Sequence, residues 1–300
     1  MTNFVKSDYD PIEKVVVGLP YGWNPADVGK TPKNFSEIIT DDGRSIEERL
    51  GEEEEMLINI LRDFGCHILR PLKIDRSYLL KKNLISFDSG FFQCFPRDLY
   101  FILEDKIIEL YPEKMNRDAE KTGIINIINK QKNSIKNENM DVVIEGGNII
   151  VAEDTIYFGI RECPNDSEKA SLNYIIENAE GYSVKTIPLH PTVKHLDLAM
   201  SIINEDTAIV STDVINSKLI ENIDNLIKIT YNEAHDFITN GLQIDSHNYV
   251  MCKPRNVNPY RVEKIVENMK ANVITIPFHI HNSFSGGIRC ATLPLYRSNF

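Results

Sequence analysis

Short apolar runs alternate with amphipathic stretches along most of the chain, and this alternation predicts strand–helix–strand units. The first unit combines an apolar strand at residues 13–20 (EKVVVGLP), a helix, and a second strand at 67–72. The helix begins at Ser45, which forms a capping box with Glu48, and Gly65 provides its stop. An α/β fold follows from this order of elements.

Three more units repeat the order, and most carry an extra strand in front. The second unit is predicted to have strands at 154–160 and 182–189 around a helix at 168–179. The third has strands at 207–212 and 226–230 around a helix at 214–224. The fourth has strands at 248–254 and 272–278 around a helix with Pro259 in its first turn. The extra strands precede tight turns rich in Asp, Asn and Ser, at 148–151, 198–203 and 241–244, with a further hairpin at 99–103 and 106–110.

The repeating unit is therefore strand–turn–strand–helix–strand, about 40 to 50 residues long, and a repeat of this period indicates a solenoid, a propeller or a closed array. Residues 114–139 are polar and rich in Lys and Asn, which predicts a surface loop beside a poorly defined helix. A last strand at 291–295 is expected to pair with 15–18, joining the termini and removing open sheet edges. No linker divides the chain, so residues 1–300 are predicted to form a single domain.

Composition narrows the function classes. The 300 residues are 42% hydrophobic and 26% charged, as in globular proteins. A net charge of −11 argues against nucleic acid or an anionic membrane as partner. The first ten residues lack the apolar region of a signal peptide, and no apolar run is long enough to span a membrane, so a cytoplasmic protein is expected.

The cysteine pattern adds a further expectation. Five cysteines without a CxxC pair fit neither a disulfide framework nor a zinc site, so no metal is predicted. Four of them are interpreted as structural: Cys66, Cys94, Cys163 and Cys252. His190, His279 and His281 flank predicted strands and receive no role.

Five polar residues stand at the heads of the repeated units, where a radial arrangement brings equivalent positions together: Asp98, Glu145, His195, Asp197 and Cys290. Each signal alone is weak, since most single cysteines are inert and Gly–Gly pairs usually mark turns. Their shared position carries the prediction of a site. His195 can pass protons for a Cys290 nucleophile, and Glu145 can orient the histidine. Asp98 and Asp197 can bind a planar, fork-shaped cation.

The chain resembles the guanidino-group modifying enzymes, a superfamily of arginine deiminases, dimethylarginine hydrolases, agmatine deiminases and amidinotransferases. Five motifs carry the resemblance in the family's order: YDPIEKVVVGLP (9–20), FPRDLYFILEDKIIEL (95–110), IEGGNIIV (144–151), HLDLAMSII (195–203) and SGGIRCATLPLYR (285–297). The resemblance implies a five-bladed α/β propeller of pseudo-repeated ββαβ units, with the active site on its axis.

The resemblance also assigns roles. Cys290 corresponds to the nucleophile, His195 to the general acid/base, and Glu145 to its carboxylate partner, while Asp98 and Asp197 correspond to the guanidinium-binding pair. The implied reaction is thiolate attack on a guanidino carbon, loss of an amine, and release of the amidino group to water or to a second amine.

Two further positions are assigned to substrate binding by the same resemblance. Arg161 stands close to, but offset from, an arginine that binds substrate carboxylate in arginine deiminases, and Asn148 replaces an acidic residue common on the hydrolase side. Ser285 stands where those deiminases have another arginine, which makes an ordinary arginine deiminase a weaker hypothesis.

The branch within the superfamily stays open. The PRD segment at 96–98 resembles the amidinotransferases, whereas Glu145–Gly–Gly and the CATLPLYR ending at 290–297 resemble the hydrolases. The first hypothesis is an amidinotransferase that moves an amidino group from arginine, giving ornithine, to an amine acceptor. The alternatives are a hydrolase of arginine deiminase or dimethylargininase type, and a non-catalytic binding protein. No cofactor is implied, and a homodimer is left open.

Overall fold

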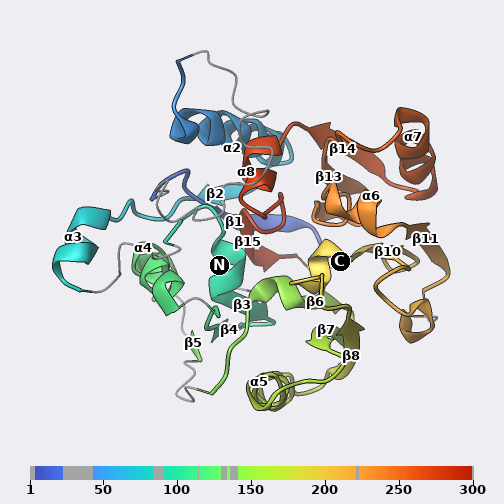
Figure 1. The fold of residues 1–300 in the computed structure, drawn as a ribbon, viewed down its shortest axis with the longest axis horizontal. Coiled ribbons are helices and arrows are strands. Elements are labelled where there is room, and N and C mark those ends of the chain that lie inside the picture. The colour runs from blue at the N-terminus through green and yellow to red at the C-terminus, as the bar shows by residue number, and fades with distance from the viewer. Residues whose placement is uncertain are drawn as a thin grey trace.

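Five three-stranded sheets surround a common centre in the computed structural model (Figure 1). The structure describes residues 4–22, 43–83, 91–113, 115–129, 134–135, 141–220 and 223–298. In chain order the sheets contain β1 (Ile12–Val17), β2 (His67–Leu69) and β15 (Thr292–Arg297); β3 (Tyr100–Leu103), β4 (Lys106–Glu109) and β5 (Ser134–Ile135); β6 (Ile149–Ala152), β7 (Thr155–Arg161) and β8 (Ser183–Leu189); β9 (Met200–Asn204), β10 (Thr207–Ser211) and β11 (Asn225–Ile229); and β12 (Leu242–Asp245), β13 (Asn248–Cys252) and β14 (Asn272–Ile276).

Every sheet has the same internal pairing. Its middle strand is antiparallel to one neighbour and parallel to the other, as β7 is to β6 and β8. The first sheet obtains its antiparallel strand from the far end of the chain, because β15 pairs with β1 and aligns Val15 with Pro294. The predicted α/β class, the repeated unit and the closure of the ring by the last strand are therefore confirmed.

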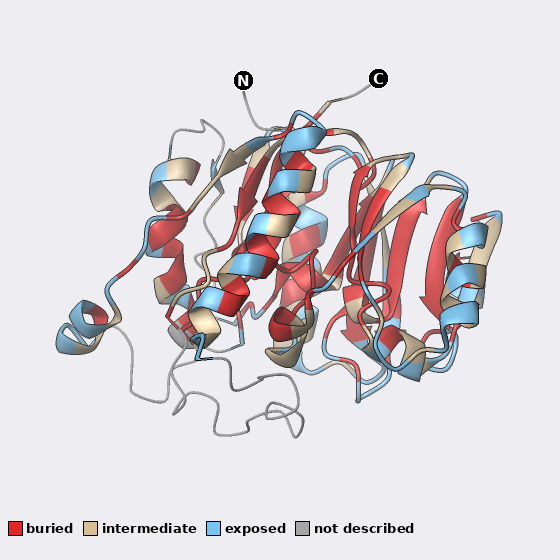
Figure 2. Ribbon diagram, turned by 90° about the horizontal axis from the view of Figure 1, so that it is seen from above, coloured by how far each residue is buried: buried red, intermediate tan, exposed pale blue. Residues whose placement is uncertain are grey.

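Helices lead from the middle strand to the parallel strand in four sheets: α2 (Ile46–Asp63), α4 (Lys121–Ile128), α5 (Asp166–Asn178) and α7 (Pro259–Asn268). Ser45 and Glu48 form the predicted capping box of α2, and Gly65 follows its end with φ of +78°. The apolar face of α2 is buried, including Leu50, Leu57 and Leu61. Figure 2 shows the sheets largely buried and the helices exposed on their outer faces.

One predicted helix is wrong. The described part of the segment 214–224 contains a short 3₁₀ turn, η6 (Ser217–Ile220), and no α-helix. Polar side chains compete for its backbone groups, since the Asn216 side chain accepts a hydrogen bond from the Lys218 N–H. Such local hydrogen bonds favour turns over a continuous helix.

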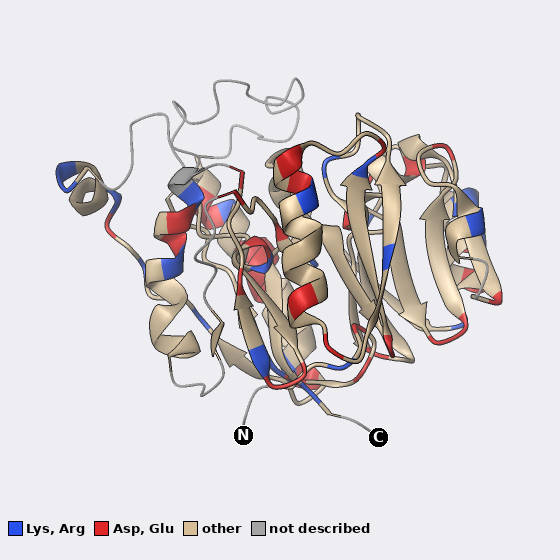
Figure 3. Cartoon of the chain, turned by 90° about the horizontal axis from the view of Figure 1, so that it is seen from below, with Lys and Arg blue, Asp and Glu red and all other residues tan. Residues whose placement is uncertain are grey.

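The remaining short elements lie around the ring and at the ends of the sheets: α3 (Arg76–Lys81), α6 (Tyr231–His235), α8 (His279–Ser283), η2 (Pro96–Leu99), η3 (Met115–Glu120), η4 (Gly146–Asn148) and η5 (Leu196–Leu198). The polar segment 114–139, predicted as a surface loop, contains η3, α4 and β5 in its described part. Charged residues gather on helices and on loops, and most strand residues are uncharged (Figure 3). Among the described residues, no helix combines the length and apolarity that a membrane span requires.

Candidate active site

Three equivalent 3₁₀ turns carry four of the five predicted site residues. Asp98 lies in η2, Glu145 is the N-cap of η4, His195 is the N-cap of η5, and Asp197 lies within η5. Each turn leads directly into the first strand of its sheet, so equivalent positions meet at one end of the ring. Cys290 reaches the same place from the segment before β15.

His195 and Glu145 form a buried pair. The imidazole Nε2 lies 2.5 Å from Glu145 Oε2, and both side chains are almost fully buried. Burial alone would lower the pKa of His195, but the Glu145 hydrogen bond and the charges of Asp98 and Glu145 outweigh it and raise the pKa. The glutamate pKa is lowered well below its usual range, because His195, Lys194 and other cations outweigh the opposing effect of burial. The pair therefore favours a protonated imidazole beside an ionised carboxylate.

Cys290 lies beside Asp197, with its Sγ 4.0 Å from Asp197 Oδ2. Burial, followed by the charges of Asp197 and Asp98, raises the pKa of the thiol well above its usual value. The thiol is consequently protonated near neutral pH as long as these carboxylates lack an added cation. A positive group placed between them would lower the thiol pKa again.

Asp98 and Asp197 are each held by an arginine. Asp98 Oδ2 accepts a hydrogen bond from Arg117 Nη1 at 2.7 Å, and its Oδ1 lies 3.3 Å from the Gly147 N–H donor. Asp197 Oδ2 accepts from Arg289 Nη1 at 3.0 Å. These contacts fix the orientation of both carboxylates in the absence of a ligand.

One carboxylate oxygen of Asp197 accepts no hydrogen bond in the described structure. Within the described part of the chain, Asp197 Oδ1 is buried without a hydrogen-bond partner, and the whole side chain has 0% relative exposure. A buried carboxylate oxygen without a donor is costly and uncommon in folded proteins. Burial also raises the pKa of Asp197 despite the opposing charge of Arg289. This oxygen is therefore suited to accept a donor from a bound cation.

Arg117 and Arg289 were not predicted to take part in the site. Arg289 immediately precedes Cys290 in the motif SGGIRCATLPLYR (285–297). Its position next to the candidate nucleophile could therefore have indicated a place in the site. Arg117 falls in the polar segment interpreted as a surface loop, yet it is buried and also contacts Glu120 and Glu145, at 3.1 Å and 3.7 Å. Nothing in the local sequence distinguishes this arginine from the basic residues around it.

Asn148 and Arg161, both predicted to bind substrate, have other partners in this structure. Asn148 Oδ1 accepts a hydrogen bond from the Leu196 N–H at 3.1 Å, which ties η4 to the residue between His195 and Asp197. The Arg161 side chain is exposed at the end of β7 and forms an ion pair with Glu168 at 2.8 Å. Neither side chain forms an ion pair with a residue of the five-residue cluster in the described structure. Their role in substrate binding stays a prediction.

Gly147 packs directly against the imidazole ring of His195. A methyl group at its Cα would lie 2.6 Å from His195 Nδ1 and 2.8 Å from its Cγ, closer than real side-chain contacts allow. We expect Gly147→Ala to displace the buried imidazole and lower kcat about 10²-fold, the usual effect of a misplacement near 1 Å. Steady-state rates together with a thermal melt would measure this. Gly51→Ala is the matched control, because the nearest atom to its added methyl is Pro20 Cγ at 3.8 Å; equal rates for both variants would refute the steric assignment.

Side chains of metal-ligating type gather at a second cluster, formed by Glu54, Cys94 and His281. The other cysteines of the described chain are free thiols, with Cys163 exposed and Cys66 and Cys252 buried.

Comparisons with known proteins identify a family and several structures that this chain resembles. The family of eukaryotic N,N dimethylarginine dimethylhydrolases matches residues 84–297, which include all five residues of the cluster. A curated relative is the uncharacterized protein YkgA of Bacillus subtilis (strain 168), 23% identical over 297 residues, covering 97% of this chain and 94% of the relative.

Solved structures share the fold along nearly the whole chain. The amidinotransferase SxtG of saxitoxin biosynthesis from Microseira wollei is 15% identical with a TM-score of 0.78, covering 99% of this chain and 98% of that one. The inosamine-phosphate amidinotransferase StrB1 from Streptomyces griseus is 16% identical with a TM-score of 0.76, covering 99% and 97%. The dimethylarginine hydrolase DDAH from Pseudomonas aeruginosa, complexed with citrulline, is 15% identical with a TM-score of 0.69, covering 94% and 99%.

Proposed function

The chain belongs to the N,N dimethylarginine dimethylhydrolase family, and from this premise we propose that it hydrolyses a guanidino substrate through a covalent intermediate on Cys290. Membership confirms the resemblance to the guanidino-group modifying enzymes that the five motifs carry. It also favours the hydrolytic branch over the transfer reaction that the sequence analysis placed first. The Glu145–Gly–Gly form of the motif supports the same branch.

The observation that carries the proposal is the unpartnered Asp197 Oδ1, buried beside the Cys290 thiol. A guanidinium has N–H donors arranged in a plane, and it can satisfy this oxygen while bonding Asp98 on its other side. Its carbon would then lie next to Cys290 Sγ. The substrate is therefore positioned by the carboxylates whose charges hold the thiol protonated in the free protein.

Binding of a cation between these carboxylates offsets their charge and lowers the pKa of Cys290, so the thiol releases its proton to solvent and the thiolate forms when substrate is present. The thiolate attacks the guanidino carbon and gives a tetrahedral adduct. Protonated His195 donates its proton to the departing amine, and the carbon stays bound to sulfur as an amidino-thioether.

The second half of the reaction uses the same groups in the reverse sense. Neutral His195 removes a proton from water, the hydroxide adds to the amidino carbon, and collapse of the adduct breaks the carbon–sulfur bond. The products are a ureido compound and an amine, with His195 protonated again. Glu145 supports the imidazolium at both stages and does not itself react.

The product pattern tests the reaction type. We expect the protein to release citrulline and the corresponding amine from arginine or a methylated arginine with no acceptor added. Mass spectrometry of reactions with and without added amines identifies each product. Ornithine formed only when an amine is present, together with the amidinated amine, would contradict hydrolysis and establish transfer.

Transfer is the second candidate, because the two amidinotransferases resemble this chain over at least 97% of their lengths with TM-scores of 0.76 or above. In that case ornithine is the amine that departs in the first half of the reaction, and an amine acceptor replaces water as the group that His195 deprotonates in the second. If no tested guanidine gives either the hydrolysis products or the transfer products, and Cys290 is unreactive, the non-catalytic alternative is supported.

A further inference from the structure

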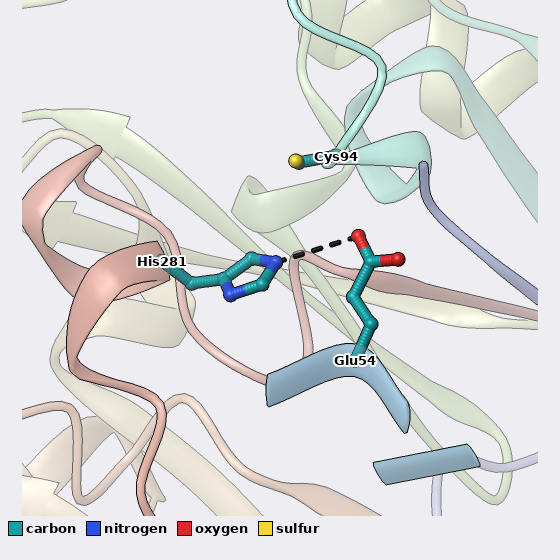
Figure 4. Close-up of side chains that lie close together, drawn as sticks. All are labelled: Glu54, Cys94 and His281. Atoms are coloured by element: carbon teal, nitrogen blue, oxygen red, sulfur yellow. Dashed lines mark ion pairs between the residues drawn. The ribbon is translucent and has the colours of Figure 1, made fainter. Parts of the chain in front are cut away.

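A buried cluster of potential metal ligands lies apart from the proposed nucleophile. Glu54 lies on α2, Cys94 precedes η2 by two residues, and His281 lies on α8. One ligand atom from each side chain lies within 4.8 Å of the other two, and all three residues are buried. Figure 4 shows the three side chains pointing toward one another from these separate elements. The cluster therefore joins three segments that are far apart in the sequence.

Two buried atoms of the cluster have only each other as a partner. Glu54 Oε1 and His281 Nε2 form an ion pair at 3.5 Å, and neither has a further hydrogen bond to any residue that the structure describes. Their residues have relative exposures of 1% and 0%. Buried polar atoms without a hydrogen bond are uncommon in folded proteins. A cation between them would satisfy both.

The surrounding contacts hold these side chains in place for a ligand. His281 Nδ1 lies 2.8 Å from Glu53 Oε2, and the Phe278 ring stacks on the imidazole with centroids 4.0 Å apart. On the other side, Arg70 Nη2 donates to Glu54 Oε2 at 2.5 Å, so Oε1 is the oxygen that faces His281 Nε2. A carboxylate behind a histidine fixes its tautomer and directs the other ring nitrogen at the metal in many known sites.

We propose that Glu54 Oε1, Cys94 Sγ and His281 Nε2 bind a divalent ion of the zinc type. One sulfur, one nitrogen and one oxygen ligand suit zinc, which prefers tetrahedral coordination by this mixture of donors. Zinc bonds of about 2.0–2.3 Å require ligand atoms about 3.4–3.6 Å apart. The Glu54–His281 separation of 3.5 Å already meets this requirement, and Cys94 Sγ lies within 4.8 Å of both of these atoms.

The charges and protons of such a site balance. Cys94 Sγ now donates to the Leu19 carbonyl at 3.2 Å, so the thiol releases its proton to solvent when the ion binds. The His281 imidazole, which lies between the carboxylates of Glu53 and Glu54, must also release the proton on Nε2 before that nitrogen can bind the ion. The ion then faces the charges of the Cys94 thiolate and Glu54, while Arg70 and Glu53 offset each other in the surrounding layer. No net charge is left buried.

The ion would lie outside the proposed active site and hold two of the segments that lead into it. Cys94 stands four residues before Asp98, and His281 stands nine residues before Cys290. Both segments would be fixed to α2 through one ion. The prediction of no metal rested on the absence of a CxxC pair, and ligands spread over residues 54 to 281 leave no such spacing to detect.

Cobalt substitution tests the site directly. The full chain carrying Cys290→Ala, which removes the other candidate thiol ligand, is freed of metal with a chelator and titrated with Co²⁺. We expect one equivalent to bind, with tetrahedral d–d bands and a thiolate-to-cobalt charge-transfer band. Cys94→Ser in the same background should lose the charge-transfer band and bind at least 10-fold more weakly. Cys252→Ser is the matched control and should retain both, because Cys252 is an equally buried thiol outside the cluster.

A second measurement avoids the risk that a Cys94 variant fails to fold. Zinc X-ray absorption of the Cys290→Ala protein, loaded with Zn²⁺, should show one sulfur at about 2.3 Å and nitrogen or oxygen ligands at about 2.0–2.1 Å. Absence of a sulfur ligand, no binding of Co²⁺, or an unchanged charge-transfer band in Cys94→Ser would overturn the proposal. Those results would leave His281 as a protonated imidazole between Glu53 and Glu54. Guanidine turnover is measured separately, so this proposal can fail while the hydrolase holds.

Discussion

Cys290→Ala is expected to abolish turnover of guanidino substrates, with a loss of at least about 10⁴-fold in kcat. The proposed chemistry needs a covalent bond to this sulfur, and the described neighbours of Cys290 offer no second nucleophile at that position. Asp197 lies 4.0 Å from the sulfur, but it is held by Arg289 and is assigned to the substrate cation. Its carboxylate cannot replace a thiolate in attack on a charged guanidino carbon.

The loss should be catalytic and not structural. Alanine removes one buried sulfur atom from a core residue, a change that leaves the packing of β15 largely intact. Initial rates, a thermal melt and a far-ultraviolet circular dichroism spectrum measure the two effects separately. Acid-quenched wild-type reactions should also carry the mass of the substrate less the departed amine on the peptide containing Cys290, and the variant should not.

Cys252→Ala provides the matched control for this experiment. Cys252 belongs to the same buried core cluster as Cys290, and burial raises its pKa to about 12. Its sulfur contacts Asn282 at 3.6 Å and no residue of the proposed site. We expect this variant to keep most of the activity. Comparable rates for Cys290→Ala and wild type would remove the covalent mechanism altogether.

The repeated architecture was predictable because its signals are local. Capping at Ser45, Pro259 in the first turn of α7 and the hairpin turns each depend on a few neighbouring residues. The site was predictable for a related reason. When every unit begins with the same strand, residues at the heads of those strands meet at one end of the ring, as Glu145 and His195 do.

What escaped prediction depends on contacts between distant residues. Arg117 looks like any basic residue in a polar segment, and only the packed structure places it against Asp98. The Glu54–Cys94–His281 cluster likewise arises from three segments with no common spacing. A helix was expected at 214–224 from its place between two strands, but the hydrogen bond that the Asn216 side chain accepts from the Lys218 N–H favours a short turn.

Replacing Glu145 with glutamine should lower kcat about 10²–10⁴-fold, the range for losing effective acid–base catalysis. Glu145 is the carboxylate beside His195 Nε2, and its hydrogen bond and charge counter the burial that would otherwise lower the histidine pKa. Glutamine keeps the shape and removes the charge. His195 then loses its proton at a lower pH, and less of the protein carries the acid that protonates the leaving amine.

The pH profile distinguishes this role from simple loss of structure. A raised His195 pKa keeps the imidazole protonated to higher pH, so the alkaline limb of the wild-type kcat profile reflects deprotonation of a group with a raised pKa. In Glu145→Gln that limb should move to lower pH, while KM changes little because Glu145 is assigned no contact with the substrate. Glu145→Asp retains the charge and should recover part of kcat and of the profile.

Lys194 supplies a control on the same carboxylate. Its Nζ lies 2.7 Å from Glu145 Oε2, but its side chain is 50% exposed, so the ion pair contributes little. Lys194→Ala should leave kcat within a few fold of wild type. An alkaline limb that stays in place in Glu145→Gln, despite the lower rate, would mean that another group holds the His195 proton. Arg117 and Asp98 would then carry the electrostatics of the site, since both lie within the same buried network as Glu145.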